Sequence, residues 1–287
     1  MRPRLTPWGG AARKRRCGPW PAAGPFRVAA VVSRVAASRT PSRSTLTGML
    51  VAAAVCPCPP LLVPEVAAGA APELDAARAA CADAVGVLAA ARPDLLIVAG
   101  PAGPDHPGPF PAGSPGSFAG FGVGLTVRLG QDPAPSPAPP RPLPASLAVG
   151  AWLLERARWS GAPVEGFGVA ERLEPDRCVR AGRELAARAD RVAMLVMGDG
   201  SACRTVKAPG YLDERAADFD AEAARALGTA DLAALSALDE TLAHELSVAG
   251  RAPWQVLAGA AEGAGLGGQP LYEDAPYGVG YVVASWS

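Results

Sequence analysis

The apolar run Val51–Val55 ends abruptly at three closely spaced prolines, Pro57, Pro59 and Pro60. Proline cannot continue a central β-ladder, because it has no backbone N–H to donate and its φ is fixed. A strand must therefore end near Cys56 and leave its last side chains at an edge of the sheet. In open α/β sheets, that edge is where ligands usually bind.

The charge of the chain changes near residue 49. The chain has 27 basic and 27 acidic residues, but residues 1–48 contain ten basic residues and no acidic one. Residues 49–287 therefore hold 17 basic and 27 acidic residues, a net charge of −10. The first segment is rich in Pro, Gly, Ser and Arg and has no helical or strand periodicity, so we expect 1–48 to be a disordered basic leader.

Three interpretations of this leader stay open: a targeting segment, an arm that binds nucleic acid, or upstream sequence that is not part of the native protein. We favour the third, because Met49 stands immediately before the first well-formed strand. The acidic character of 49–287 argues against nucleic acid as a partner of the folded domain. The oligomeric state is not readable from these residues.

Six cysteines in 287 residues are too few for a disulfide scaffold, so we expect a reducing, cytoplasmic environment. No apolar run approaches the ~18 residues that a membrane-spanning helix needs. The sequence therefore predicts a cytoplasmic protein with no membrane partner.

Helical and strand-like patterns alternate along the rest of the chain. The spacing predicts helices at 72–91, 146–159, 175–189, 214–227, 231–248 and 253–261, and strands at 51–56, 94–100, 163–170, 191–198 and 277–286. A Pro/Gly-rich insertion at about 101–145 interrupts this order, with one strand expected at 120–130. Alternation of this kind predicts an α/β fold with a mostly parallel central sheet and helices on both faces.

Five segments resemble, in this order, motifs of the class III extradiol ring-cleavage dioxygenase superfamily. They are CPCPPLLVPEV (56–66), PDLLIVAGPA (93–102), MGDGSACR (197–204), WQVLAGAAEG (254–263) and APYGVGYVVAS (275–285). The resemblance implies an α/β sheet sandwiched by helices. In active members, two histidines and a glutamate hold ferrous iron, which opens catechol-type rings with dioxygen.

The chain departs from that family at the positions of the metal ligands. Cys58 stands where the first motif has histidine, and neither Gly100–Ala102 nor Gly198–Ala202 contains one. His106 and His244 are the only histidines of the chain, and neither falls on a ligand position. The iron site implied by the resemblance is therefore degenerate, which leaves Fe(II), Zn and no cofactor as alternatives.

Polar residues next to the predicted strand ends are candidates for a ligand pocket. They are Cys58, Asp199, Ser201, Arg204, Lys207, Glu273 and Tyr277. Simple turn capping is the alternative for Asp199 and Ser201, and surface exposure is the alternative for Glu273.

Cys56, Cys58 and Cys203 are candidate metal ligands, because soft thiolates bind zinc or copper. His106, together with Asp105, is a further candidate if its loop folds back over the sheet edge. The alternatives are buried, inert cysteines and an exposed loop histidine. His244 is expected to be exposed near Glu240.

The leading hypothesis is a dioxygenase-like protein whose pocket at the sheet edge accepts a small molecule, for example an aromatic one. If the iron site were intact, its chemistry would be that of an oxidoreductase. The first alternative is a non-catalytic binding or scaffold protein that keeps the fold, and the second is a thiolate-metal protein.

Overall fold

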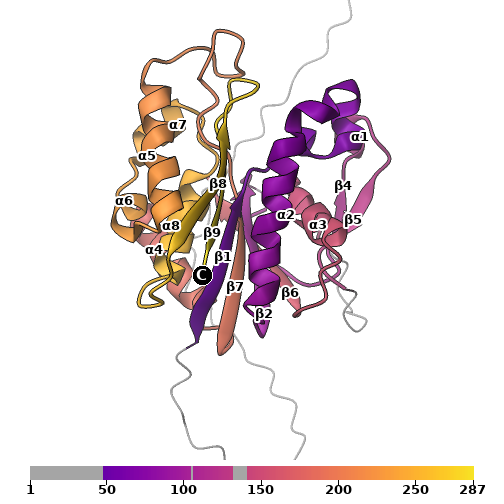
Figure 1. The fold of residues 1–287 in the computed structure, drawn as a ribbon, viewed down its shortest axis with the longest axis vertical. Helices are drawn as coiled ribbons and strands as arrows, with labels where there is room; N and C mark the ends of the chain where they lie inside the picture. Colours follow the sequence, from indigo (N-terminus) through magenta and orange to yellow (C-terminus); the bar gives the residue numbers. More distant parts are fainter. Residues whose placement is uncertain (1–47, 105, 132–140) are drawn as a thin grey trace, which may run out of the picture. The chain divides into compact units, whose positions relative to one another are not determined.

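A seven-stranded sheet forms the centre of the described part of the chain (Figure 1). Its strands lie in the order β3 (Gly108–Phe110), β6 (Val164–Ala170), β2 (Leu95–Ala102), β7 (Arg191–Met197), β1 (Met49–Cys56), β9 (Tyr281–Trp286) and β8 (Gly268–Asp274). The inner strands β6, β2, β7 and β1 pair in parallel, and the outer strands are antiparallel to their neighbours. The predicted α/β class with a largely parallel core is confirmed, and β1 ends at Cys56, as the prolines require.

The computed structural model describes residues 48–104, 106–131 and 141–287, which belong to one compact unit, Thr45–Ser287. The predicted leader, apart from Gly48, lies outside the described residues, as do Asp105 and residues 132–140 of the Pro-rich insertion. No helix in the described ranges is long and apolar enough to cross a membrane.

Helices cover both faces of the sheet (Figure 1). On one face lie α1 (Pro64–Ala67), α2 (Asp75–Ala90) and α3 (Ala145–Arg156), and on the other lie α4 (Pro175–Ala186), α5 (Arg215–Thr229), α6 (Leu232–Ser236), α7 (Glu240–Glu245) and α8 (Arg251–Ala260). Short 3-10 turns cover Pro60–Leu62, Ala68–Leu74 and Ala119–Phe121. The predicted helix at 72–91 thus begins as a 3-10 turn and becomes α-helical at Asp75.

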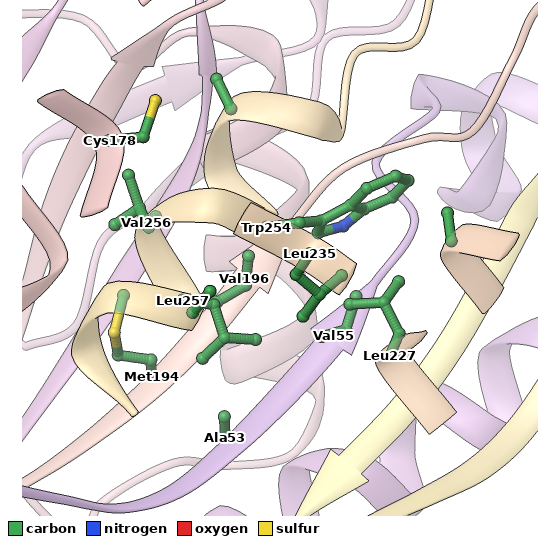
Figure 2. Packing of buried hydrophobic residues seen from close by; sticks show 14 of the residues in the cluster. Ala53, Val55, Cys178, Met194, Val196, Leu227, Leu235, Trp254, Val256 and Leu257 are labelled. Carbon is green, nitrogen blue, oxygen red and sulfur yellow. The ribbon is translucent and has the colours of Figure 1, made fainter. Parts of the chain in front are cut away.

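Alternate residues of β1 supply the two apolar cores. Ala53 and Val55 pack under α8 with Met194 and Val196 of β7 (Figure 2). Ala52 and Ala54 belong to the core on the α2 and α3 side. Since side chains alternate across a strand, a continuous apolar run is what a strand covered on both faces needs.

Helices α4 and α8 approach each other closely enough that two glycines are required. A Cβ on Gly182 would come within 3.0 Å of the Val256 carbonyl oxygen, and one on Gly259 would come within 3.0 Å of the Val179 backbone. This contact anchors α4 and α8 on the same face of the sheet.

The predicted insertion belongs partly to the main sheet. Its strand β3 pairs antiparallel with β6, and β4 (Pro115–Ser117) and β5 (Thr126–Arg128) form a separate two-stranded ribbon. The single strand predicted at 120–130 is confirmed only at Thr126–Arg128 (β5). Gly122 adopts a left-handed conformation (φ 84°) that ends a 3-10 turn before β5 begins.

The single helix predicted at 231–248 is also wrong. The segment forms two short helices, α6 and α7, because the side chains of Asp231 and Asp239 each cap a helix N-terminus. The leucine stripe still marks the buried side, since Leu235 and Leu246 are fully buried. The last strand starts at Tyr281 rather than 277, and the sequence pattern missed β8 altogether.

Candidate functional site

The ends of β1 and β7 are joined by two of the predicted site residues. The backbone N–H of Cys58 donates to Asp199 Oδ1 at 2.8 Å, and the Cys58 thiol lies 3.7 Å from Asp199 Oδ2. The Gly198 N–H donates to the Cys56 carbonyl at 3.0 Å, which holds the two strand ends together. Both side chains therefore lie at the carboxyl edge of the sheet, as predicted.

The surroundings of this pair raise the pKa of both of its acidic groups. Asp199 is half-buried, and burial raises its pKa from 3.8 to about 6 against the opposing hydrogen bonds from Cys58. Burial, and then the Asp199 carboxylate, raise the pKa of Cys58 well above its usual range. At neutral pH the pair therefore consists of a neutral thiol beside a carboxylate.

One tyrosine of the β8–β9 hairpin, Tyr281, lies close enough to the same pair to interact with it electrostatically. Burial, and then Asp199 and Cys58, raise the pKa of Tyr281, and Tyr277 and Tyr272 contribute smaller effects. The Tyr277 hydroxyl is buried and has no hydrogen-bond partner within the described residues; burial, and then Glu73, raise its pKa. The neutral phenol of Tyr281 therefore lies near the thiol–carboxylate pair.

A second group of predicted residues converges on Asp220 of α5, which is only 4% exposed. Its Oδ1 accepts from the Ser201 N–H at 2.7 Å, and its Oδ2 accepts from Ser201 Oγ at 2.7 Å and Arg204 Nη1 at 3.1 Å. A Cβ on Gly200 or Gly280 would come within 3.0 Å of an Asp220 carboxylate oxygen. The network therefore fixes the loop after β7 against the start of β9.

A cavity of about 320 Å³ opens beside this network, and its lining includes Arg204, Asp220, Glu273, Asp274 and Tyr281. The Arg204 side chain is 31% exposed, and only one of its nitrogens is bound by Asp220. Glu273 is exposed and makes no side-chain hydrogen bond to any described residue. Two predicted residues, Arg204 and Glu273, therefore share one cavity; we call it the Arg204 cavity.

Sequence reasoning missed Asp220 and Tyr281. Asp220 could have been recognised in the sequence, because it is an acidic residue next to Phe219 on the buried side of a helix. A buried charge requires hydrogen-bond or ionic partners. The predicted Lys207 is exposed, and only its backbone N–H makes a contact, to Thr205 Oγ1 at 3.3 Å.

The three candidate thiolate ligands are not brought together. Cys56 lies in the core on the α2 side, where its hydrogen bond with Cys81, followed by burial, raises its pKa. Cys58 shares that core, whereas Cys203 lies in the core on the other face, with its thiol 3.5 Å from the Gly210 and Leu246 carbonyl oxygens. A shared site of Cys56, Cys58 and Cys203 is therefore not formed.

Neither histidine makes a hydrogen bond or ion pair with Cys58 or Asp199 in the described part of the chain. His106 is half-buried in the loop before β3, where its backbone N–H donates to the Gly103 carbonyl at 3.0 Å. His244 is exposed on α7 and lines a cavity of about 230 Å³ with Glu171 and Glu240. In the residues that the structure describes, no group of three or more His, Cys, Asp or Glu side chains is arranged to hold a metal ion.

The residues at the sheet edge therefore do not fit ferrous iron. Cys58, at the position of the first family ligand, is a neutral thiol that faces a carboxylate. Neither Gly100–Ala102 nor Gly198–Ala202 supplies an imidazole. Iron of this class requires two imidazoles and a carboxylate on one face of the metal.

Comparison with known proteins does not assign the chain to a family. No protein-family model matches the chain, and no curated protein matches its sequence. One similar solved structure is that of an uncharacterized protein from Escherichia coli K12. The match covers 82% of the present chain and 99% of the Escherichia coli chain, with 14% sequence identity and a TM-score of 0.47. A likeness at this level does not identify a function.

Proposed function

We propose that this chain is a small-molecule-binding protein that retains the form of the class III extradiol ring-cleavage dioxygenase superfamily without its iron chemistry. Its ligand would be a small zwitterion held in the Arg204 cavity. The observation that carries this proposal is the Ser201–Asp220–Arg204 network, which fixes a guanidinium group on the wall of a cavity that also contains free carboxylate oxygens.

The charges of the cavity lining support a zwitterionic ligand. The Arg204 guanidinium has donors left after its bond to Asp220, and these suit a carboxylate or similar oxyanion. Glu273 and Asp274 provide carboxylates on the same lining, which suit an ammonium group. A ligand with both groups, such as a free amino acid, would satisfy both sides of the cavity.

The size of the cavity and the rigidity of its wall support this proposal. A volume of about 320 Å³ is near the lower end of the range for small-molecule sites, roughly 300–1,000 Å³. Because the Asp220 carboxylate is buried and already accepts three hydrogen bonds, Arg204 is positioned before a ligand arrives. Such preorganisation reduces the entropy cost of binding.

We also propose that the protein is cytoplasmic. All five cysteines of the described residues are free and buried, which suits a reducing compartment.

Calorimetric titration of the full chain with a panel of free L-amino acids tests the ligand class. The N-acetyl and the amide derivatives serve as references, because each lacks one of the two charges. We expect at least one free amino acid to bind, with both derivatives weaker by about tenfold or more. Arg204→Gln and Glu273→Gln would remove this binding, whereas Arg172→Gln, at an exposed arginine without a described partner, would preserve it.

Two results would contradict the proposal. Unchanged binding in Arg204→Gln would put the ligand elsewhere, and binding of no zwitterion in the panel would reject the ligand class. Anaerobic loading with ferrous iron, followed by desalting and metal analysis, tests the absence of iron chemistry independently. Iron retained near one equivalent, and lost in Asp199→Ala, would restore the dioxygenase hypothesis.

A further inference from the structure

A second cavity lies between β6 and α4, on the face of the sheet opposite α2. Its volume is about 370 Å³, and its lining includes Phe167, Leu173, Arg177, Arg180 and Glu184. We call it the α4 cavity. None of these residues belongs to the Arg204 cavity or to the Cys58–Asp199 pair.

Helix α4 places two of its three arginines on one stripe that faces this cavity. Arg177, Arg180 and Glu184 follow the three- and four-residue steps of a single helix face, whereas Cys178 and Leu185 are buried in the core. The α4 cavity therefore lies along the edge of the core, where Ala181 both lines the cavity and packs against the core.

Some arginines of α4 and of the residues just after it form ion pairs, and others do not. Arg183 forms a two-pronged ion pair with Glu262, at 2.5 and 2.8 Å, and Arg188 pairs with Glu165 at 2.8 Å. Arg177 and Arg180 are exposed and have no ion pair or side-chain hydrogen bond within the described part of the chain. Two guanidinium groups are therefore free to bind an anion at the α4 cavity.

The position of Arg177 does not follow from helix stability. It lies in the first turn of α4, which begins at Pro175, and the helix dipole is positive there. A cation at this end is unfavourable, and acidic residues such as Asp176 are preferred. Arg177 therefore gains nothing from the helix dipole, and its guanidinium has no carboxylate partner within the described residues.

The floor of the α4 cavity is apolar. Phe167 and Leu173 are partly buried there, and Val169 beside them is 1% exposed. A bare inorganic anion would leave this floor in contact with water, whereas a ligand with an apolar body would cover it. The lining is therefore complementary to a molecule with an anionic head and an apolar body.

We infer that the α4 cavity is a binding site for small organic anions, with Arg177 and Arg180 holding the oxyanion and Phe167 and Leu173 contacting the apolar body. Carboxylates and phosphate monoesters share this chemistry, since both bind guanidinium groups through paired N–H donors. Glu184 lies on the same lining, so the net charge of the three ionic side chains is +1, which suits a single anionic group.

Calorimetric titration of the full chain with benzoate and with phenyl phosphate tests this site, and separates the two kinds of head group. Benzyl alcohol supplies the ring without the charge, and inorganic phosphate supplies the charge without the ring. We expect one or both organic anions to bind, and both references to bind at least about tenfold more weakly. The affinity is expected to fall with added salt.

Variants of exposed arginines provide matched controls on one helix. Arg177→Gln/Arg180→Gln is expected to weaken anion binding by about tenfold or more, whereas Arg183→Gln, which removes a guanidinium paired with Glu262, is expected to leave it unchanged. Circular dichroism and the melting temperature would verify that the variants fold. Equal binding of benzyl alcohol, or unchanged anion binding in the double variant, would overturn the inference.

Discussion

The carboxylate of Asp199 accepts a hydrogen bond from the backbone N–H of Cys58 at 2.8 Å, and so joins two strand ends that lie 141 residues apart in the chain. In the family that the sequence resembles, the position of Cys58 belongs to an iron ligand. Here it belongs to a contact between the ends of β1 and β7, near Tyr281 of β9.

Replacing Asp199 by asparagine is expected to stabilise the protein at high pH. The folded-state pKa of about 6 lies above the ordinary value of 3.8, so folding takes up a proton between these values, and the free energy of unfolding falls as pH rises through about 6. Asp199→Asn removes this penalty. The free energy of unfolding of the variant is therefore expected to exceed that of the unsubstituted protein by up to about 3 kcal/mol at pH 8 and by about half of that at pH 5. Urea unfolding at both pH values measures the difference.

A loss of stability in Asp199→Asn that is the same at both pH values would contradict this expectation. It would mean that the hydrogen bond from the Cys58 N–H to the carboxylate stabilises the fold by more than the burial of the negative charge destabilises it. Asp218→Asn, at an exposed aspartate of α5, serves as the control and is expected to change stability by less than about 0.5 kcal/mol.

Replacing Asp220 by alanine is expected to destabilise the protein by about 2–4 kcal/mol. The change leaves the Ser201 N–H and hydroxyl buried without an acceptor and removes the ion pair with Arg204. The free energy of unfolding in urea measures the loss, with Asp218→Ala on the same helix as the reference. A loss below about 1 kcal/mol would show that water replaces the carboxylate.

Two glycine-to-alanine changes are expected to act in opposite directions. Gly182→Ala would force a methyl group into the Val256 carbonyl and separate α4 from α8, at a cost of about 2 kcal/mol or more. Gly86→Ala, in α2, meets no atom within 4 Å and is expected to stabilise the protein by about 0.5–1 kcal/mol. Melting temperatures of both variants check the prediction, and equal shifts would contradict the close helix contact.

The thiols of the folded domain are expected to resist alkylation. Cys56, Cys58, Cys178 and Cys203 are buried, and burial contributes to a raised pKa at each of them. Because the thiolate is the reactive form, iodoacetamide at pH 8 should modify these residues only after unfolding in urea. Peptide mass mapping with and without urea measures this, and fast labelling of Cys58 in the folded protein would reveal an accessible, reactive thiol.

Local sequence patterns were sufficient to predict the layered α/β fold and the end of β1 at Cys56. Those features depend on local rules: prolines stop a ladder, apolar runs mark strands covered on both faces, and helical spacing marks amphipathic segments. The same rules located Asp199, Ser201 and Arg204 after a buried strand, because polar residues that follow such a strand must lie at its edge. The pattern failed at β8 and at the split between α6 and α7, where strand alternation is weak and an aspartate cap overrides leucine spacing.

Local patterns do not predict which of these residues contact one another. Asp220 became the centre of the Ser201–Arg204 network, and Cys203 was separated from Cys56 and Cys58 by the sheet itself. Arg177 and Arg180 were left without the carboxylate partners that Arg183 and Arg188 found among the described residues. These outcomes depend on contacts between segments far apart in the chain, and such contacts are set by how helices pack on the sheet rather than by any local pattern.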